Sequence, residues 1–160
     1  MRFLVALTVC FLAFATTARA QDFDRGYAAY KAGNFAVALA EWYPLAKHGY
    51  ASAQIALAVM YRNGEGVPQD FAEAARWHRR AALQGHSNAQ TNLAWMYFYG
   101  DGVAQDFLAA HMWFNIAAAN GEPGAAVFRD MAARQLTRAY VAEAERRARV
   151  CMASHYAKCG

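Results

Sequence analysis

Serine, cysteine and proline are scarce in this sequence, with three of each among 160 residues. No Gly-x-Ser-x-Gly motif surrounds any of the serines, and the five histidines show neither an HExxH motif nor another spacing typical of metal ligands. We therefore predict no catalytic residues, no metal site and no cofactor. We expect the protein not to be an enzyme.

Long apolar runs are also lacking, apart from one at the N-terminus. It spans residues 3–15, follows Arg2 and precedes an Ala-Arg-Ala sequence at positions 18–20. A basic start, a short apolar stretch and a small-x-small site are typical of a secretory signal peptide. We therefore expect residues 1–20 to be a signal peptide, with an uncleaved anchor as the alternative. Residues 21–160 should form one domain without stable membrane insertion.

A large excess of one charge is missing as well. The chain has 16 Lys and Arg residues and 12 Asp and Glu residues. Without Arg2 and Arg19 the counts are 14 and 12, which leaves a net charge of +2. Domains that bind nucleic acids usually carry a marked basic patch or stripe. The composition therefore predicts no nucleic-acid partner.

Two cysteines, Cys151 and Cys159, remain once the leader is removed. An even number of cysteines in an exported chain favours a disulfide. In one continuous helix the two residues would lie about 12 Å apart, which is too far for a bond. A disulfide between them therefore requires a bend in the chain. A free thiol pair and an intermolecular bridge are the alternatives.

The most informative feature is an internal repeat of 36 residues. Residues 51–86 align without gaps with residues 87–122, and seventeen of the 36 aligned positions are identical. The repeated segments YRNGEGVPQDF and YFYGDGVAQDF show the similarity most clearly. A fixed period of this length is typical of proteins built from stacked helical units.

Each unit is predicted to contain two antiparallel helices. We expect Ser52 and Asn88 to cap the first helix, because their side-chain oxygens can accept hydrogen bonds from free backbone N–H groups. The first helix should end at Gly64 and Gly100, since glycine readily adopts the left-handed conformation found at helix ends.

The second helix of each unit follows a short Gly-x-Gly-Val loop. Asp70 and Asp106 are predicted to cap it, because a carboxylate is favoured at the positive end of a helix dipole. It should end at Gly85 and Gly121. The repeated segments are thus explained mainly as turns between helices.

The flanking segments are predicted to be atypical helix pairs. Residues 23–50 follow the same register in their second half, but their two helices have a shorter connection. Residues 123–160 should begin with a helix capped at Gly124 and end with a longer helix capped by Thr137. Modified terminal units are expected, because the ends of a stack face solvent.

The repeated residues form a long and specific motif. The pattern Ala-Gln-x-x-Leu-x-x-Met-Tyr-x-x-Gly-x-Gly-Val-x-Gln-Asp…Ala-x-x-Trp…Ala-Ala-x-x-Gly occurs at 51–86 and again at 87–122. It resembles the Sel-one-like repeat (SLR), a relative of the tetratricopeptide repeat (TPR). The resemblance implies an all-α, right-handed α-solenoid of about four antiparallel helix hairpins. Two full SLR units would lie between a TPR-like N-terminal hairpin and a C-terminal capping helix pair.

The resemblance also carries expectations about function. SLR proteins serve as adaptors, usually for other proteins, and exported bacterial members act in envelope assembly, secretion and regulation. It therefore implies a bacterial protein that is periplasmic or secreted. A cysteine-rich branch binds β-lactam compounds and has one disulfide per repeat, with cysteines spaced like Cys151 and Cys159. Only one such pair occurs here, which argues against β-lactam binding and favours an intramolecular bridge in the C-terminal cap.

Positions shared by the two units indicate the core. On the first helix they include Leu57, Met60 and Tyr61, which share one helical stripe. A repeat unit can bury such a stripe only against its neighbour. The residues expected in the core are Met60, Met96, Tyr61, Tyr97, Trp77 and Trp113.

Positions that differ between the units form a second stripe on the first helix, rotated from the core by about 200°. In the solenoids that this chain resembles, first helices line the concave face, so we expect this stripe to bind a protein or an extended peptide. The expected partner-binding residues are Trp95, Phe98, Tyr99, Val59, Arg62, Asn63 and Thr91. Gln54 should add a hydrogen bond at the rim. Alternatively, the three aromatic residues pack against neighbouring helices.

Basic residues occur in two groups. One lies on the second helix of the first unit and contains Arg76, His78, Arg79 and Arg80; the other lies in the last two helices and contains Arg129, Arg134, Arg138, Arg146, Arg147 and Arg149. Solvated helix faces are the simplest interpretation of such groups. Contact with an acidic partner or an anionic lipid is the alternative.

The sequence thus favours a monomeric, non-catalytic, exported adaptor that binds a protein or extended peptide in a concave groove. One alternative is a binder of small molecules, such as β-lactams or cell-wall fragments. Another is a structural subunit of an envelope complex.

Overall fold

The computed structural model describes residues 22–159, and the predicted signal peptide lies outside this range. Eight helices and no strand occur within it. The first helix covers residues 22–31. The others are α2 (Phe35–Lys47), α3 (Ala51–Asn63), α4 (Phe71–Ala82), α5 (Ser87–Tyr99), α6 (Phe107–Ala119), α7 (Ala125–Ala133) and α8 (Arg138–Ala153). The prediction of an all-α solenoid is confirmed.

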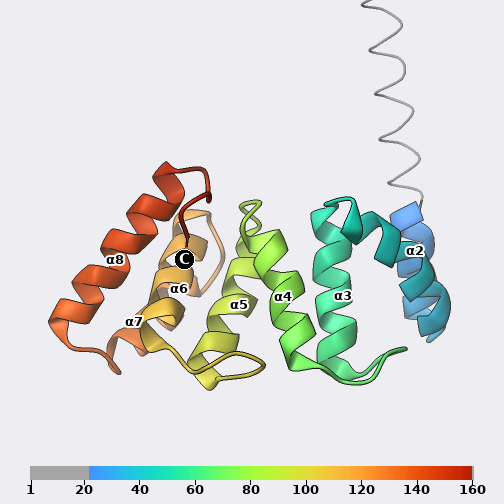
Figure 1. The fold of residues 1–160 in the computed structure, drawn as a ribbon, viewed down its shortest axis with the longest axis horizontal. Coiled ribbons are helices and arrows are strands. Elements are labelled where there is room, and N and C mark those ends of the chain that lie inside the picture. Colours follow the sequence, from blue (N-terminus) through green and yellow to red (C-terminus); the bar gives the residue numbers. More distant parts are fainter. Residues whose placement is uncertain (1–21, 160) are drawn as a thin grey trace, which may run out of the picture.

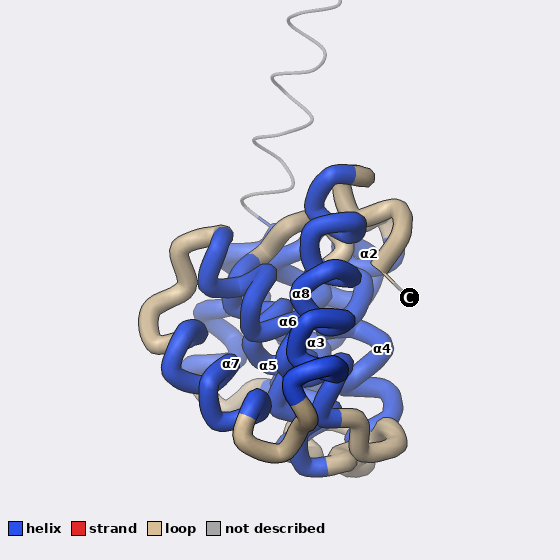
Figure 2. The backbone as a smooth tube through the Cα atoms, turned by 90° about the vertical axis from the view of Figure 1, so that its left-hand side faces the viewer, coloured by secondary structure: helices blue, strands red, loops and turns tan. Residues whose placement is uncertain are grey.

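The helices are stacked in chain order along one direction (Figure 1). Each of α3 to α6 packs on the helix before it and the helix after it, and α6 also contacts α8. Figure 2 shows the same stack with the α7–α8 end toward the viewer. No helix within residues 22–159 is long and apolar enough to cross a membrane.

The repeated segments form the turns that the sequence predicts. Helices α3 and α5 end at Gly64 and Gly100, both in the left-handed conformation. A carboxylate oxygen of Asp70 accepts a hydrogen bond from the backbone N–H of Glu73, and Asp106 does the same for Ala109, both at 2.9 Å. These caps satisfy N–H groups that would otherwise lack partners at the start of α4 and α6.

The predicted N-caps of the first helices are wrong. Helices α3 and α5 begin at Ala51 and Ser87, and their cap positions are Tyr50 and His86, which make no side-chain cap hydrogen bond. Ser52 and Asn88 therefore lie inside the helices. The preceding glycine turns start each first helix earlier, because the chain reverses there at positive φ.

The ends of the second helices also lie slightly before the predicted glycines. Helix α4 ends at Ala82 and α6 ends at Ala119, two to three residues before Gly85 and Gly121. Both glycines have positive φ, at 88° and 84°, so they form the turn rather than the last helical position. The predicted caps at Gly124 and Thr137 are correct for α7 and α8.

Buried glutamines tie one hairpin to the next. Gln54 is 3% exposed and donates to the carbonyl of Ala46 at 3.1 Å, and Gln90 makes the same bond to Ala82. Gln84 in turn donates to the side chain of Gln54 at 2.8 Å. The expectation that Gln54 lies at the rim of a groove is therefore wrong. Its amide joins successive units, because a buried amide must find partners inside the protein.

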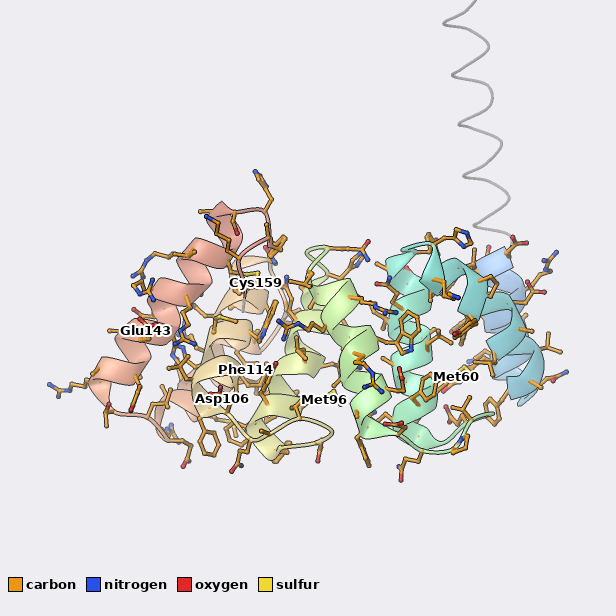
Figure 3. The ribbon with its side chains drawn as sticks, viewed as in Figure 1. Met60, Met96, Asp106, Phe114, Glu143 and Cys159 are labelled. Carbon is orange, nitrogen blue, oxygen red and sulfur yellow. A yellow bond between two sulfur atoms is a disulfide. The ribbon has the colours of Figure 1, made fainter. Side chains whose placement is uncertain are left out.

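The core contains the residues that the two units share. Met60, Met96, Trp77 and Trp113 are all at most 4% exposed, and the methionines lie within the helix stack (Figure 3). Tyr61 and Tyr97, which were also expected in the core, are only half-buried. The buried residues at shared positions thus form the contact between neighbouring units.

Candidate functional site

A hollow of about 360 Å³ lies across the first helices of the N-terminal half. We call it the N-terminal groove. Three aromatic residues of the first helix line one side, and Ile55, Ala56 and Val59 of α3 line the other. Its complete lining is Phe23, Tyr27, Tyr30, Trp42, Ser52, Ile55, Ala56, Val59 and Asn88. Of the seven predicted binding residues, the groove contains Val59.

The aromatic side of the groove was missed in the sequence. Phe23, Tyr27 and Tyr30 recur at spacings of four and three residues, which place them on one stripe of the helix. The 36-residue register does not reach them, because the first hairpin has a shorter connection. The spacing within the helix would have been sufficient to find them.

Two of these side chains are fixed in different ways. Phe23 stacks on Trp42, with ring centroids 5.6 Å apart. The hydroxyl of Tyr30 donates to a carboxylate oxygen of Glu65 at 2.7 Å, and this hydrogen bond raises the pKa of Tyr30. Tyr27 remains 53% exposed. The groove therefore offers an ordered aromatic wall with one accessible ring.

The predicted aromatic residues of α5 form a separate cluster, which we call the aromatic cluster: Trp95, Phe98, Tyr99, Phe114 and Phe128. Trp95 is at its centre, with its ring 5.0 Å from Phe114 of α6 and 4.7 Å from Phe128 of α7. Tyr99 also stacks on Trp95, with ring centroids 5.4 Å apart, and is 61% exposed. The two interpretations of this stripe thus apply to different residues: Trp95 packs between helices, whereas Tyr99 faces solvent.

The polar members of the predicted set lie between the groove and the cluster in sequence. Arg62 and Asn63 are exposed. Arg62 donates to the side chain of Asn92 on the next first helix at 3.4 Å, and Asn63 donates to Glu65 at 3.3 Å. The hydroxyl of Thr91 is buried without a hydrogen-bond partner among the described residues. Arg62 can therefore span two units or turn to a ligand, while Thr91 cannot reach one without rearrangement.

His78 does not belong to the exposed basic group in which the sequence placed it. It is 0% exposed, and neither ring nitrogen has a hydrogen-bond partner among the described residues. Burial, with a smaller contribution from the positive charge of Arg62, lowers the pKa of His78 from 6.5 to about 4. His111 is also buried, and its pKa is lowered mainly for the same reason. Both imidazoles are neutral in the folded protein at neutral pH.

These buried histidines predict a loss of stability in acid. Between pH 6.5 and about 4 the unfolded chain binds a proton at position 78 that the folded protein excludes. Stability is therefore complete above pH 6.5 and falls as the pH drops, by about 2 kcal/mol at pH 5 for His78 alone. Urea unfolding at pH 7.5 and pH 5.0, followed by circular dichroism, measures this difference.

A variant isolates the contribution of His78. His78→Phe introduces the residue that the second unit carries at the matching position, Phe114, and it removes the titrating group. The loss of stability on acidification should shrink by about 2 kcal/mol. His86→Phe is the control for replacing a histidine outside the core, because His86 is exposed. An equal pH dependence in His78→Phe and the unmodified protein would contradict the assignment.

Within residues 22–159, no group of three or more His, Cys, Asp or Glu side chains could hold a metal ion.

The two cysteines of this range, Cys151 and Cys159, form a disulfide after the chain turns at His155 and Tyr156. Stacked helical hairpins, with a groove lined by residues of the first helices, define a helical-repeat protein.

The family model described as Sel1 repeat matches residues 51–86 and 87–122, so the chain carries two Sel1 repeats. These are the two 36-residue units described above. Sel1 repeats commonly mediate contacts between proteins, and proteins that contain them are typically scaffolds rather than enzymes. No curated protein matches the sequence.

Two solved structures are similar over much of the chain. One is a protective antigen present in uropathogenic Escherichia coli strains that displays an SLR fold, with 28% identity over 88% of this chain and a TM-score of 0.77. The other is a Sel1 repeat protein from Oxalobacter formigenes, with 28% identity over 75% of this chain and a TM-score of 0.64. The chain spans 30% of the first protein's length and 51% of the second's.

Proposed function

We propose that the protein is an exported, non-catalytic adaptor that binds an extended segment of a partner protein along its first helices. The observation that carries this proposal is the N-terminal groove, in which aromatic side chains of one first helix face apolar side chains of the next. Aromatic residues in a partly formed hollow are favoured anchors in protein interfaces. The signal-peptide pattern of residues 1–20 and the disulfide support export.

Binding would proceed by recognition on a pre-formed surface. The rings of Tyr27 and Tyr99, which are both more than half exposed, lose contact with water when a partner covers them. Arg62 and Asn63 lie between these two positions in the chain and offer hydrogen bonds to a peptide backbone. Because successive units hold the helices in place, little conformational entropy is lost on binding.

A selection experiment tests the proposal. Peptides are selected from a random phage-displayed library on the oxidised protein, and their affinities are then measured by fluorescence anisotropy. Tyr27→Ala and Tyr99→Ala should each weaken the selected peptides by about tenfold, as expected for a buried aromatic anchor. The loss follows from removing apolar contact area rather than from unfolding, since both side chains are largely exposed.

Tyr140→Ala is the matched control. Tyr140 lies on α8 and is 57% exposed, so its removal takes away a tyrosine of similar accessibility outside the groove and the cluster. It should leave peptide affinity within about twofold of the unmodified protein. Peptides that lose affinity equally in all three variants, or that lose it only with Tyr140→Ala, would rule out the proposed face.

A further inference from the structure

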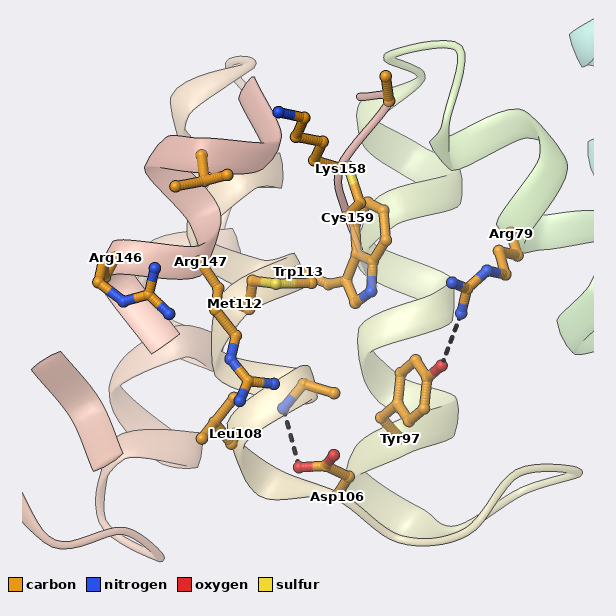
Figure 4. A pocket seen from close by; sticks show the side chains of 13 residues that line it. Arg79, Tyr97, Asp106, Leu108, Met112, Trp113, Arg146, Arg147, Lys158 and Cys159 are labelled. Carbon is orange, nitrogen blue, oxygen red and sulfur yellow. Dashed lines mark hydrogen bonds between the residues drawn. The ribbon is translucent and has the colours of Figure 1, made fainter. Parts of the chain in front are cut away.

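A second cavity, of about 570 Å³, lies between α4, α6 and α8 and is closed at one side by the C-terminal turn. We call it the basic cavity. Arg79 and Arg147 approach it from opposite sides, and Trp113 lies between them (Figure 4). Lys158 is at its upper rim in the same view. None of these residues belongs to the N-terminal groove or the aromatic cluster.

We propose that the basic cavity binds a small organic anion. Its carboxylate or phosphate group would accept hydrogen bonds from the arginine side chains that line the cavity, and its apolar part would contact Met112 and Val150, which also line it. This site is independent of the proposed adaptor surface, because it uses other helices and other side chains.

The hydrogen-bond donors that reach the cavity are incompletely used. Arg79 donates to the hydroxyl oxygen of Tyr97 at 3.1 Å, so its charge is not neutralised by that partner, and the hydroxyl hydrogen of Tyr97 is left for a ligand. Arg147 donates its Nε–H to Glu143 at 2.8 Å, which leaves its two terminal amino groups. The indole N–H of Trp113 faces the side of Arg79 and makes no hydrogen bond to a described residue (Figure 4). Hydrogen-bond donors on four lining side chains are therefore available to an anion in the cavity.

Charge in the cavity favours an anion. Four of its lining residues are basic, namely Arg79, Arg146, Arg147 and Lys158, and one is acidic, Asp106. A carboxylate oxygen of Asp106 is already occupied as the cap of α6. Glu143 pairs with both Arg146 and Arg147 and offsets part of their charge. With Glu143 included, four positive groups face two negative groups, so the charge around the cavity is net positive.

The first unit shows that repeat geometry alone does not produce this cavity. Thirty-six residues earlier, Tyr43 stands at the position of Arg79 and Arg76 at the position of Met112. The ring of Tyr43 packs against the edge of Trp77, with centroids 6.3 Å apart, and the indole N–H of Trp77 is buried. The matching tryptophan of the second unit, Trp113, is 1% exposed and lines the cavity together with basic side chains. The cavity therefore depends on the side chains at these positions and not on the repeated backbone geometry.

The disulfide holds the C-terminal residues that form one wall of the basic cavity. Helix α8 ends at Ala153, and the chain then folds back so that Cys159 bonds to Cys151. This covalent link holds Ala157, Lys158 and Cys159 against the cavity. The bond therefore fixes a basic residue at the rim that a free C-terminal tail would leave mobile.

Nuclear magnetic resonance of the oxidised, ¹⁵N-labelled protein tests the proposal with three probes. Phenyl phosphate and phenylacetate carry the two candidate anionic groups, and phenylacetamide is their neutral counterpart. The indole N–H signal of Trp113, assigned from its loss in Trp113→Phe, should shift on addition of at least one anion and not on addition of the amide. The anion that binds more tightly identifies the group that the cavity prefers.

Variants then locate the binding. Arg79→Gln and Arg147→Gln should each lower the affinity for the bound anion by about tenfold, because each removes a charged hydrogen-bond donor. Arg149→Gln removes an equal charge from an exposed position on α8 outside the cavity, and it should change affinity less than about twofold in 0.15 M salt. No shift with either anion, equal binding of phenylacetamide, or equal losses in Arg79→Gln and Arg149→Gln would overturn the proposal.

Discussion

Replacing Gly102 with alanine should lower the free energy of unfolding by about 3 kcal/mol, which is a large fraction of the stability of a small domain. A Cβ at this position would overlap the backbone carbonyl group of Phe71, which is the first residue of α4 in the preceding unit. The backbone φ is 69°, so an alanine would also be strained in its own conformation. Backbone atoms cannot turn aside as a flexible side chain can, and the two units would have to separate. Urea unfolding followed by circular dichroism measures the loss.

Gly121→Ala separates steric overlap from backbone strain. Gly121 has a φ of 84°, and nothing lies within 4 Å of the position that its Cβ would take. The expected loss is therefore about 1 kcal/mol, from the left-handed conformation alone. Equal losses at Gly102 and Gly121 would show that the loop of the second unit does not lock against the preceding helix.

The same contact explains why the sequence repeats its glycine loops. Gly66, in the first unit, lies against Phe35 of α2 as Gly102 lies against Phe71. A Cβ added at Gly66 would be 2.8 Å from the Cβ of Phe35. The second glycine of each Gly-x-Gly-Val segment is thus a contact between neighbouring units. The sequence predicted a turn at this place, because turn chemistry is local. It could not reveal the approach of Phe71, which depends on how two hairpins stack.

A similar limit applies to the buried polar groups. The matching of Gln54 with Gln90 was visible in the alignment, but a shared glutamine can be buried or exposed. The structure resolves this through the carbonyls of Ala46 and Ala82 in the last turns of the preceding helices, which accept hydrogen bonds from the two glutamine side chains. Position within one helix does not specify such a partner. Gln54 therefore joins two units, where the sequence suggested contact with a ligand.

For the candidate site, helical periodicity placed the predicted residues on one stripe of the first helices, but it did not give the depth of each side chain. Val59 and Trp95 occupy matching positions on α3 and α5, yet Val59 lines the groove, whereas Trp95 is covered on one side by Phe114 and Phe128. The difference comes from Phe114 of α6 and from Phe128 of α7, a helix that lies beyond the second unit and has no repeat motif of its own. Side chains of a following helix decide exposure in a solenoid, and they can be assigned only when that helix is placed.

Trp95→Ala should therefore reduce stability as well as any binding, with a loss of about 3 kcal/mol in the free energy of unfolding. The change removes a ring that contacts Phe98, Tyr99, Phe114 and Phe128, all with centroid distances between 4.7 and 5.5 Å. These contacts join α5 to α6 and α7, so their loss leaves a cavity between the second unit and the C-terminal cap. Urea unfolding of the purified variant gives the free energy directly.

Tyr99→Ala is the control for this prediction, because it removes a neighbouring ring that is 61% exposed. Its loss of stability should stay below about 1 kcal/mol, since little buried area disappears. A small loss in Trp95→Ala, comparable to that of Tyr99→Ala, would mean that Trp95 is dispensable for packing and could act directly in partner binding. A large loss of stability in Trp95→Ala and a small one in Tyr99→Ala would assign a packing role to Trp95. Tyr99 would then remain available to a partner.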